Sequence, residues 1–268
     1  MPVVVLNGIR LSYQVEGSGE LVVLVMGTGS PGRVWQLHQV PALVEAGYRV
    51  ATVDNRGVPP SDECAAGITI DDLVGDTAAL IEHLGDVPAR VVGTSLGSRI
   101  VQELALARPD LVSHTVLLAA HGRPHPVQSM LSAGERALYD AGIGLPPQYH
   151  AAVTALQNLS PRTLNNTAVV RDWLALLEFT GFHIGAGQRA QLRLADFPDR
   201  LADYRRITVP SLVVGFADDL ILPACLAREV AEAIPGARYE EIEGCGHYGY
   251  LERPAEVNEL ILKFFVMQ

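Results

Sequence analysis

The chain has 268 residues, 49% hydrophobic and 19% charged, which suffices for one core covered on both faces and argues against global disorder. Its formal net charge of -10, without a Lys- or Arg-rich run, argues against a nucleic-acid partner. The N-terminus lacks a basic segment and its apolar run is too short for a signal peptide or membrane span, so we expect a cytoplasmic protein with no membrane partner.

The cysteines favour reduced thiols. Cys64, Cys225 and Cys245 are an odd number without close pairing, which does not fit a disulfide framework. No Cys/His cluster has the spacing of zinc ligands. We therefore expect neither a metal site nor a cofactor.

Strands and helices alternate in the first part of the chain. An alternating stretch becomes solidly apolar over residues 11–25, which predicts an edge hairpin leading into a central buried strand at 21–25. Later strands are predicted at 48–53, 90–92 and 113–119, and helices at 34–46, 70–84 and 96–107.

Residues 122–207 interrupt this alternation with helical stretches and no convincing strand, which predicts a helical cap. Its candidate helices are 129–141, 147–158, 167–181 and 187–205. Alternation returns with strands at 211–216 and 238–242, a helix at 223–234 and a closing helix from 255. Repeated strand–helix units predict one α/β domain over residues 1–268, with a mostly parallel sheet covered by helices on both faces.

A serine lies between two glycines in the run Gly93-Thr94-Ser95-Leu96-Gly97. A nucleophile elbow needs small residues at these positions, because its tight strand-to-helix turn exposes the serine at the helix N-terminus. The pentapeptide alone is weak evidence, since small residues also fill such turns for packing. Here it directly follows a buried strand and precedes a helix, so we predict that Ser95 is the nucleophile.

A serine hydroxyl needs a base at neutral pH, and the best candidate is His247. This residue follows the last predicted strand, where the loops at the carboxyl ends of parallel strands converge. Most other histidines fall in predicted helices, a strand or the cap, where exposure or packing explains them. His121 and His38 are exceptions, each placed to contact a substrate.

Asp218 and Asp219 follow the predicted strand 211–216 and are the candidates for the acid that orients His247. The order Ser, Asp, His along the chain is the one found with a nucleophile elbow. The oxyanion hole is expected to use the backbone N–H groups of Leu96 and of Thr28, in the loop after the central strand. The Thr28 hydroxyl is a further candidate donor.

These motifs make the sequence resemble the α/β-hydrolase superfamily, and within it the capped hydrolases related to cofactor-free haloperoxidases, lactonases and stand-alone thioesterases of natural-product pathways. The resemblance covers nearly the whole chain. It implies an α/β-hydrolase fold, with a mostly parallel eight-stranded sheet flanked by helices and a helical cap inserted between strands 6 and 7. The segments that carry it are 54–57 with Ser61, 93–97, 215–223, and Gly246-His247 followed by 252–254.

The family's spacing rules conflict over the acid by one residue. An Asp four residues before a Pro matches Asp219 with Pro223, whereas an Asp three residues after a Gly matches Asp218 with Gly215. We favour Asp219, because the downstream spacing fixes the start of the following helix, and keep Asp218 as the alternate.

The expected reaction is hydrolysis of an ester, thioester or lactone of a mainly apolar acyl substrate, and the resemblance extends to natural-product thioesterases. Many family members carry His-Gly where this chain has Met26-Gly27, which leaves the substrate class open. An apolar cluster in the cap would line the pocket, although packing within the cap also explains it. The residues expected to contact substrate are Trp173, Phe182, His121 and Tyr248.

Two other functions fit the sequence. One is elimination, decarboxylation or cyclisation on the same scaffold, with His247 as base and Ser95 as a polar contact only. The other is ligand binding without turnover, which the complete set of triad residues disfavours. The expected partner is a small-molecule acyl substrate, free or on a small carrier, because an acidic chain repels the generally acidic acyl carrier proteins.

Overall fold

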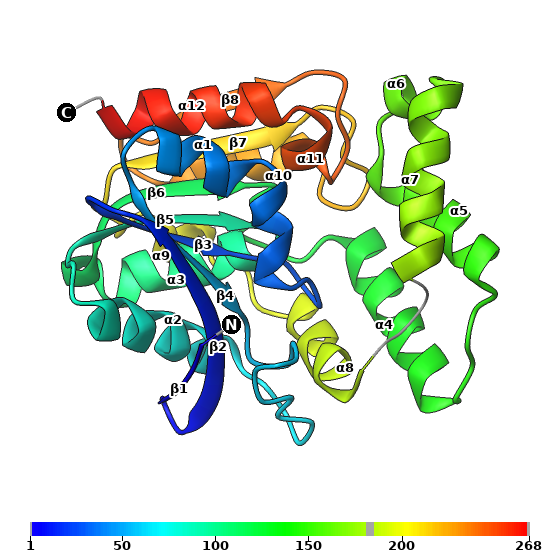
Figure 1. The fold of residues 1–268 in the computed structure, drawn as a ribbon, viewed down its shortest axis with the longest axis horizontal. Helices are drawn as coiled ribbons and strands as arrows, with labels where there is room; N and C mark the ends of the chain where they lie inside the picture. The colour runs from blue at the N-terminus through cyan, green and yellow to red at the C-terminus, as the bar shows by residue number, and fades with distance from the viewer. Residues whose placement is uncertain (1, 181–184, 267–268) are drawn as a thin grey trace.

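Eight strands form one sheet in the computed structural model, which describes residues 2–180 and 185–266 (Figure 1). The strand order is β1-β2-β4-β3-β5-β6-β7-β8; β2 is antiparallel to β1 and β4, and the other neighbours are parallel. The predicted mostly parallel eight-stranded sheet is thus confirmed. The strands are β1 (Val3–Leu6), β2 (Ile9–Gly17), β3 (Leu21–Val25), β4 (Arg49–Asp54), β5 (Ala89–Thr94), β6 (Val112–Leu118), β7 (Ser211–Phe216) and β8 (Arg238–Ile242).

The edge hairpin lies one strand earlier than predicted from the sequence. β1 and β2 are joined at Asn7-Gly8, whose φ values of 47° and 77° are the positive angles that a tight hairpin turn of this kind requires. β2 then pairs with β4 rather than β3, so the predicted hairpin over residues 11–25 is wrong. All five residues of β3 are apolar and buried, which suits a place between β4 and β5.

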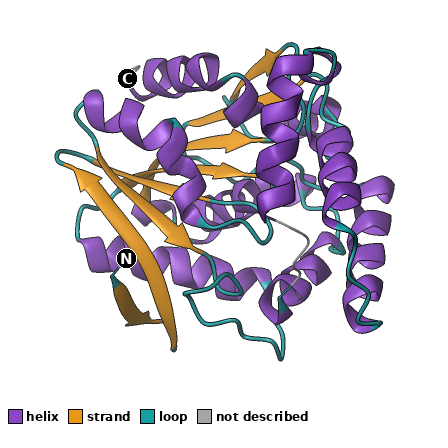
Figure 2. Ribbon diagram, turned by 45° about the vertical axis from the view of Figure 1, so that its right-hand side comes forward, coloured by secondary structure: helices purple, strands orange, loops and turns teal. Residues whose placement is uncertain are grey.

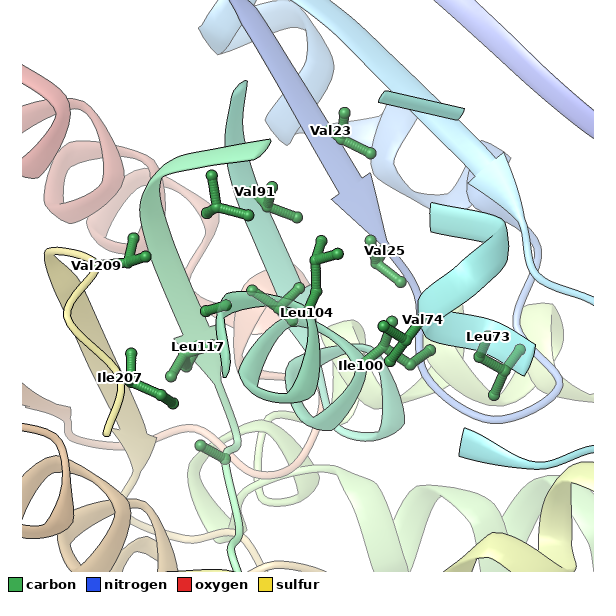
Figure 3. Close-up of a cluster of buried hydrophobic side chains, with 14 of the residues drawn as sticks. Val23, Val25, Leu73, Val74, Val91, Ile100, Leu104, Leu117, Ile207 and Val209 are labelled. Carbon is green, nitrogen blue, oxygen red and sulfur yellow. The ribbon is translucent and has the colours of Figure 1, made fainter. Parts of the chain in front are cut away.

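Helices cover both faces of the sheet, as Figures 1 and 2 show. Side chains alternate along each strand, so Val23 and Val25 of β3 belong to one apolar cluster, while Val22 and Leu24 belong to another. The first cluster includes residues of α2 (Ile70–Leu84), α3 (Leu96–Ala107) and α10 (Ala224–Ala233), and part of it is drawn in Figure 3. The second includes residues of α1 (Gln39–Glu45) and α12 (Pro254–Val266).

Two predicted helices are interrupted in the structure. The segment predicted as one helix over 34–46 is a 3₁₀ turn, η1 (Gly32–Leu37), followed by α1. The helix predicted over 187–205 ends early and gives α8 (Ala186–Leu192), η3 (Arg193–Ala195) and α9 (Leu201–Tyr204). Pro198 lies in the break, where its missing N–H and fixed φ disfavour a continuous helix.

The described residues between β6 and β7 form helices and loops without a strand. We call α4 to α8 the cap helices: α4 (Pro126–Asp140), α5 (Pro147–Asn158), α6 (Pro161–Leu164), α7 (Thr167–Thr180) and α8. α4 to α7 lie on the side of the sheet toward which the parallel strands point (Figures 1 and 2). Across the described chain, no helix combines the length and apolar character needed to span a bilayer.

Candidate active site

Ser95 occupies a strained turn between β5 and α3. Its φ of 56° and ψ of -119° are unusual for a residue with a side chain, and its N–H donates to the Leu118 carbonyl of β6 at 3.0 Å. The flanking glycines have no room for a side chain: a Cβ on Gly93 would lie 2.2 Å from the Gly97 carbonyl oxygen, and one on Gly97 would lie 2.2 Å from that of Val25. The sequence therefore folds here into the tight turn that a nucleophile elbow requires.

His247 is hydrogen-bonded to Asp219 and not to Asp218. The Nδ1 atom of His247 lies 2.7 Å from Oδ2 of Asp219, whose other oxygen accepts the backbone N–H groups of Ile221 and Leu222, both at 2.8 Å. Because the carboxylate is an acceptor, His247 donates from Nδ1, which leaves Nε2 free to take a proton. Asp218 is tied instead through its backbone N–H to the carbonyl of Cys245.

The loop that carries His247 is held by Glu252 of α11 (Gly249–Glu252). One carboxylate oxygen of Glu252 accepts the backbone N–H of Gly246 at 2.6 Å, and the other accepts the N–H and hydroxyl of Ser160 at 3.0 and 2.8 Å. A further bond runs from the Tyr248 N–H to the carbonyl of Asn158, at the end of α5. Hydrogen bonds on both sides of His247 therefore connect its loop to the cap helices.

Thr28 and Leu96, the two oxyanion-hole candidates, both belong to the surroundings of Ser95. Leu96 directly follows Ser95, and Thr28 lies one residue after Gly27, where a Cβ would meet the Ser95 Cβ at 3.2 Å. The backbone N–H groups of both residues donate to no other residue in the described chain. Two donors beside the serine are thus available to a bound oxygen.

Gln191 and Asn55 hold the loop that contains Thr28, and neither was predicted from the sequence as a site residue. Gln191 of α8 is 1% exposed; its Oε1 accepts the N–H of Gly29 at 2.7 Å and its Nε2 donates to the Arg56 carbonyl at 2.6 Å. Asn55 donates from Nδ2 to the Met26 carbonyl at 2.9 Å. Asn55 lies in the segment 54–57 that carries the family resemblance, which was the one available signal.

A cavity of about 230 Å³ lies between the sheet and the cap helices and is lined by Ser95, His247, Thr28 and Tyr248. Most cap residues that line it are polar, which corrects the expectation of an apolar pocket. These polar residues are Gln128, Ser132, Glu135, His150, Thr154, Gln157, Asn158 and Gln188.

The aromatic residue Trp173 packs behind the cavity. Its ring stacks on that of Tyr248, with 6.2 Å between centroids, and it lies against the buried cap cluster of Ala151, Ala155, Leu159 and Leu177. Tyr248 reaches the cavity surface and Trp173 is absent from the described lining. Packing within the cap thus accounts for Trp173, and Phe182 lies outside the described residues.

His121 is 2% exposed and lines a smaller cavity of about 20 Å³, together with Thr28, Leu96 and Arg99, rather than the main one. Its ring packs edge-on against Phe197. Burial, and then the positive charge of Arg99, lower the pKa of His121 to about 3, so its imidazole is neutral. His38 is placed between η1 and α1, where its carbonyl accepts the side-chain amide of Asn258.

A sequence profile, a sequence relative and solved structures all indicate one family for this chain. The sequence profile of the alpha/beta hydrolase family matches residues 22–260. A Mycobacterium tuberculosis H37Rv protein named "Putative non-heme bromoperoxidase BpoC" is 47% identical over 96% of this chain and 98% of its own, and its crystal structure superposes with a TM-score of 0.91 over 95% of both chains. The enol-lactonase from Burkholderia xenovorans LB400 superposes with a TM-score of 0.82, at 26% identity, over 99% of this chain and 100% of its own.

Proposed function

This chain belongs to the alpha/beta hydrolase family, and from that premise we propose that it hydrolyses a carboxylic ester, thioester or lactone through an acyl-enzyme on Ser95. The observation that carries the proposal is the His247–Asp219 hydrogen bond of 2.7 Å, made by a histidine that shares a cavity with Ser95. A serine at an elbow and a histidine with its acid are the parts that nucleophilic acyl transfer needs.

The reaction runs in two steps. The Ser95 Oγ attacks the carbonyl carbon and gives its proton to Nε2 of His247; the leaving alcohol or thiol then takes that proton as the carbon–oxygen or carbon–sulfur bond breaks. A water molecule attacks the acyl-enzyme in the same way, with His247 again accepting a proton and returning it to Ser95 as the free acid leaves. Asp219 stabilises the imidazolium in both steps.

The N–H groups of Thr28 and Leu96 act on the oxygen that becomes negative in each tetrahedral intermediate. Such a donor is typically worth about 3 kcal/mol of activation free energy. Gln191 and Asn55 are positioning residues in this proposal, because they hold the Thr28 loop without touching the reacting atoms.

The names of the relatives favour hydrolysis but are not uniform. A protein from Azorhizobium caulinodans that is 28% identical is named "Putative carbamate hydrolase RutD", and the enol-lactonase also bears a hydrolytic name. The relative at 47% identity is instead named as a bromoperoxidase. We place the substrate among small acyl compounds, free or on a small carrier, and natural-product thioesters are one class to be assayed.

The proposal is tested by comparing wild type with Ser95→Ala, using the exposed Ser18→Ala as the matched control. The assays are turnover of p-nitrophenyl esters, acyl thioesters and lactones, labelling by a fluorophosphonate, and bromide oxidation by hydrogen peroxide. We expect labelling and hydrolysis to be lost in Ser95→Ala and retained in Ser18→Ala, with a fall in kcat of several powers of ten.

Two outcomes would contradict the proposal. One is undiminished turnover in Ser95→Ala that is abolished by His247→Ala, which would assign His247 as the base of a non-hydrolytic reaction. The other is peroxide-dependent bromination that is indifferent to Ser95, since this would place the activity of the chain outside acyl transfer.

A further inference from the structure

The cap helix α4 places a lone carboxylate, that of Glu135, in the main cavity. Across the described residues, no group forms a hydrogen bond or ion pair with the side-chain carboxylate of Glu135. The carboxylate interacts electrostatically with Tyr248. Burial raises the pKa of the Glu135 carboxyl. A half-buried carboxylate without a partner is costly, and the cost is relieved when a positive group binds beside it.

No positively charged lysine or arginine offsets the Glu135 carboxylate among the described residues of the cavity wall. The other titratable side chains that line the cavity are two histidines, His150 and His247, and two tyrosines. Asp219 adds a second carboxylate directly behind His247. The field inside the cavity therefore favours a cation and opposes a substrate that carries its own carboxylate.

Tyr248, which interacts electrostatically with Glu135, belongs to a group of aromatic residues at the cavity. Tyr248 and Tyr250 both line the cavity, and Trp173 stacks behind Tyr248. The face of an aromatic ring attracts ammonium and guanidinium groups, so a carboxylate close to the Tyr248 ring suits an organic cation better than a neutral hydrogen-bonding group.

We propose that Glu135 binds a cationic group, an ammonium or guanidinium, on the substrate that Ser95 attacks. This inference rests on the proposed function and names its substrate class. The cation would occupy the part of the cavity beside α4, while the scissile carbonyl lies at Ser95. Glu135 then acts in binding and specificity, and its effect falls on KM more than on kcat.

The kinetic test uses two p-nitrophenyl esters of matched shape, 4-(trimethylammonio)butanoate and 5,5-dimethylhexanoate, which differ in replacing a quaternary nitrogen by carbon. We expect wild type to favour the cationic ester by about 10- to 100-fold in kcat/KM, mainly through KM, as one desolvated ion pair would give. Glu135→Gln should lose that preference, so that the ratio of kcat/KM for the two esters falls to within about threefold of one. Asp172→Asn, which removes one exposed charge from α7 of the cap, is the matched control and should keep the preference.

A binding test separates this inference from the proposed function. The N-methyl amides of the same two acids are titrated by calorimetry into Ser95→Ala and into the double variant Ser95→Ala/Glu135→Gln. Tighter binding of the cationic amide to the single variant only supports the inference, even if no ester is turned over and the proposed function fails. Equal binding of the two amides, or an ester preference that survives Glu135→Gln, overturns it.

Discussion

Oδ2 of Asp219 lies 2.7 Å from Nδ1 of His247, while the adjacent Asp218 donates its backbone N–H to the carbonyl of Cys245. The two aspartates therefore form a matched pair for mutation. We expect Asp219→Asn to keep the fold but offer His247 a donor where it needs an acceptor, lowering kcat by a factor of about 10³–10⁴. Asp218→Asn should stay within about threefold of wild type. Ester turnover by both variants checks this, and equal losses would contradict it.

Removing the amide of Gln191 should loosen the loop that carries Thr28. Gln191→Ala leaves the half-buried N–H of Gly29 and the buried carbonyl of Arg56 without their partner, so we expect a loss of about 1–3 kcal/mol in unfolding free energy and a lower kcat. Gln191→Glu keeps an acceptor for the Gly29 N–H, so its unfolding free energy and kcat should lie between those of wild type and Gln191→Ala. Urea unfolding and steady-state kinetics measure both effects, and a kcat of Gln191→Ala equal to that of wild type would exclude this positioning role.

Two helical glycines should respond to alanine with opposite signs. A Cβ on Gly97 of α3 would lie 2.2 Å from the Val25 carbonyl oxygen, so Gly97→Ala must push α3 away from β3 and should destabilise strongly. Gly134 of α4 has nothing within 4 Å of such a Cβ, and Gly134→Ala should raise the unfolding free energy by about 0.5–1 kcal/mol. Urea denaturation compares them, and a neutral Gly97→Ala would contradict the packing argument.

The buried His121 should make the protein less stable in acid. Its pKa is lowered to about 3 in the folded chain, mainly by burial, whereas an unfolded histidine titrates near 6.5. Between these values only the unfolded state binds the proton, so unfolding free energy falls as the pH falls, by about 1.4 kcal/mol per pH unit for one full proton. His121→Gln should show a shallower loss between pH 6.5 and pH 4.5 in urea unfolding. Parallel pH curves for the two proteins would refute the assignment.

Much of the fold was predictable because β3 and residues 212–216 of β7 are continuous apolar runs and the elbow around Ser95 needs glycine at two fixed positions. The hairpin was not predictable from the hydrophobic run at 11–25, because its turn depends on the two preceding residues Asn7-Gly8. Spacing alone could not separate Asp218 from Asp219, since adjacent residues after a strand differ only in the direction their side chains take.

The character of the cavity could not be inferred from composition. Polar residues of α4 and α5, such as Gln128, Glu135 and Thr154, have the pattern of a solvated helix face, and only the packing of the cap helices turns that face toward Ser95. Conversely, the apolar residues of α7 appeared suited to a substrate but include Phe179 with 90% exposure and Leu177 in the cap core. Helical periodicity identifies which residues share a face and does not say what that face meets.

The hydrogen bond that the Gly29 N–H donates to the Gln191 side chain has a consequence for protein engineering. Exchanging the cap of this enzyme for that of another hydrolase would be expected to alter substrate choice alone, because the nucleophile and its partners lie on the sheet side. Here the graft would also delete the amide that joins α8 to the Gly29 and Arg56 loops. A functional chimera must therefore carry a glutamine at this place in the donor segment, or retain α8 by ending the exchanged segment before residue 186.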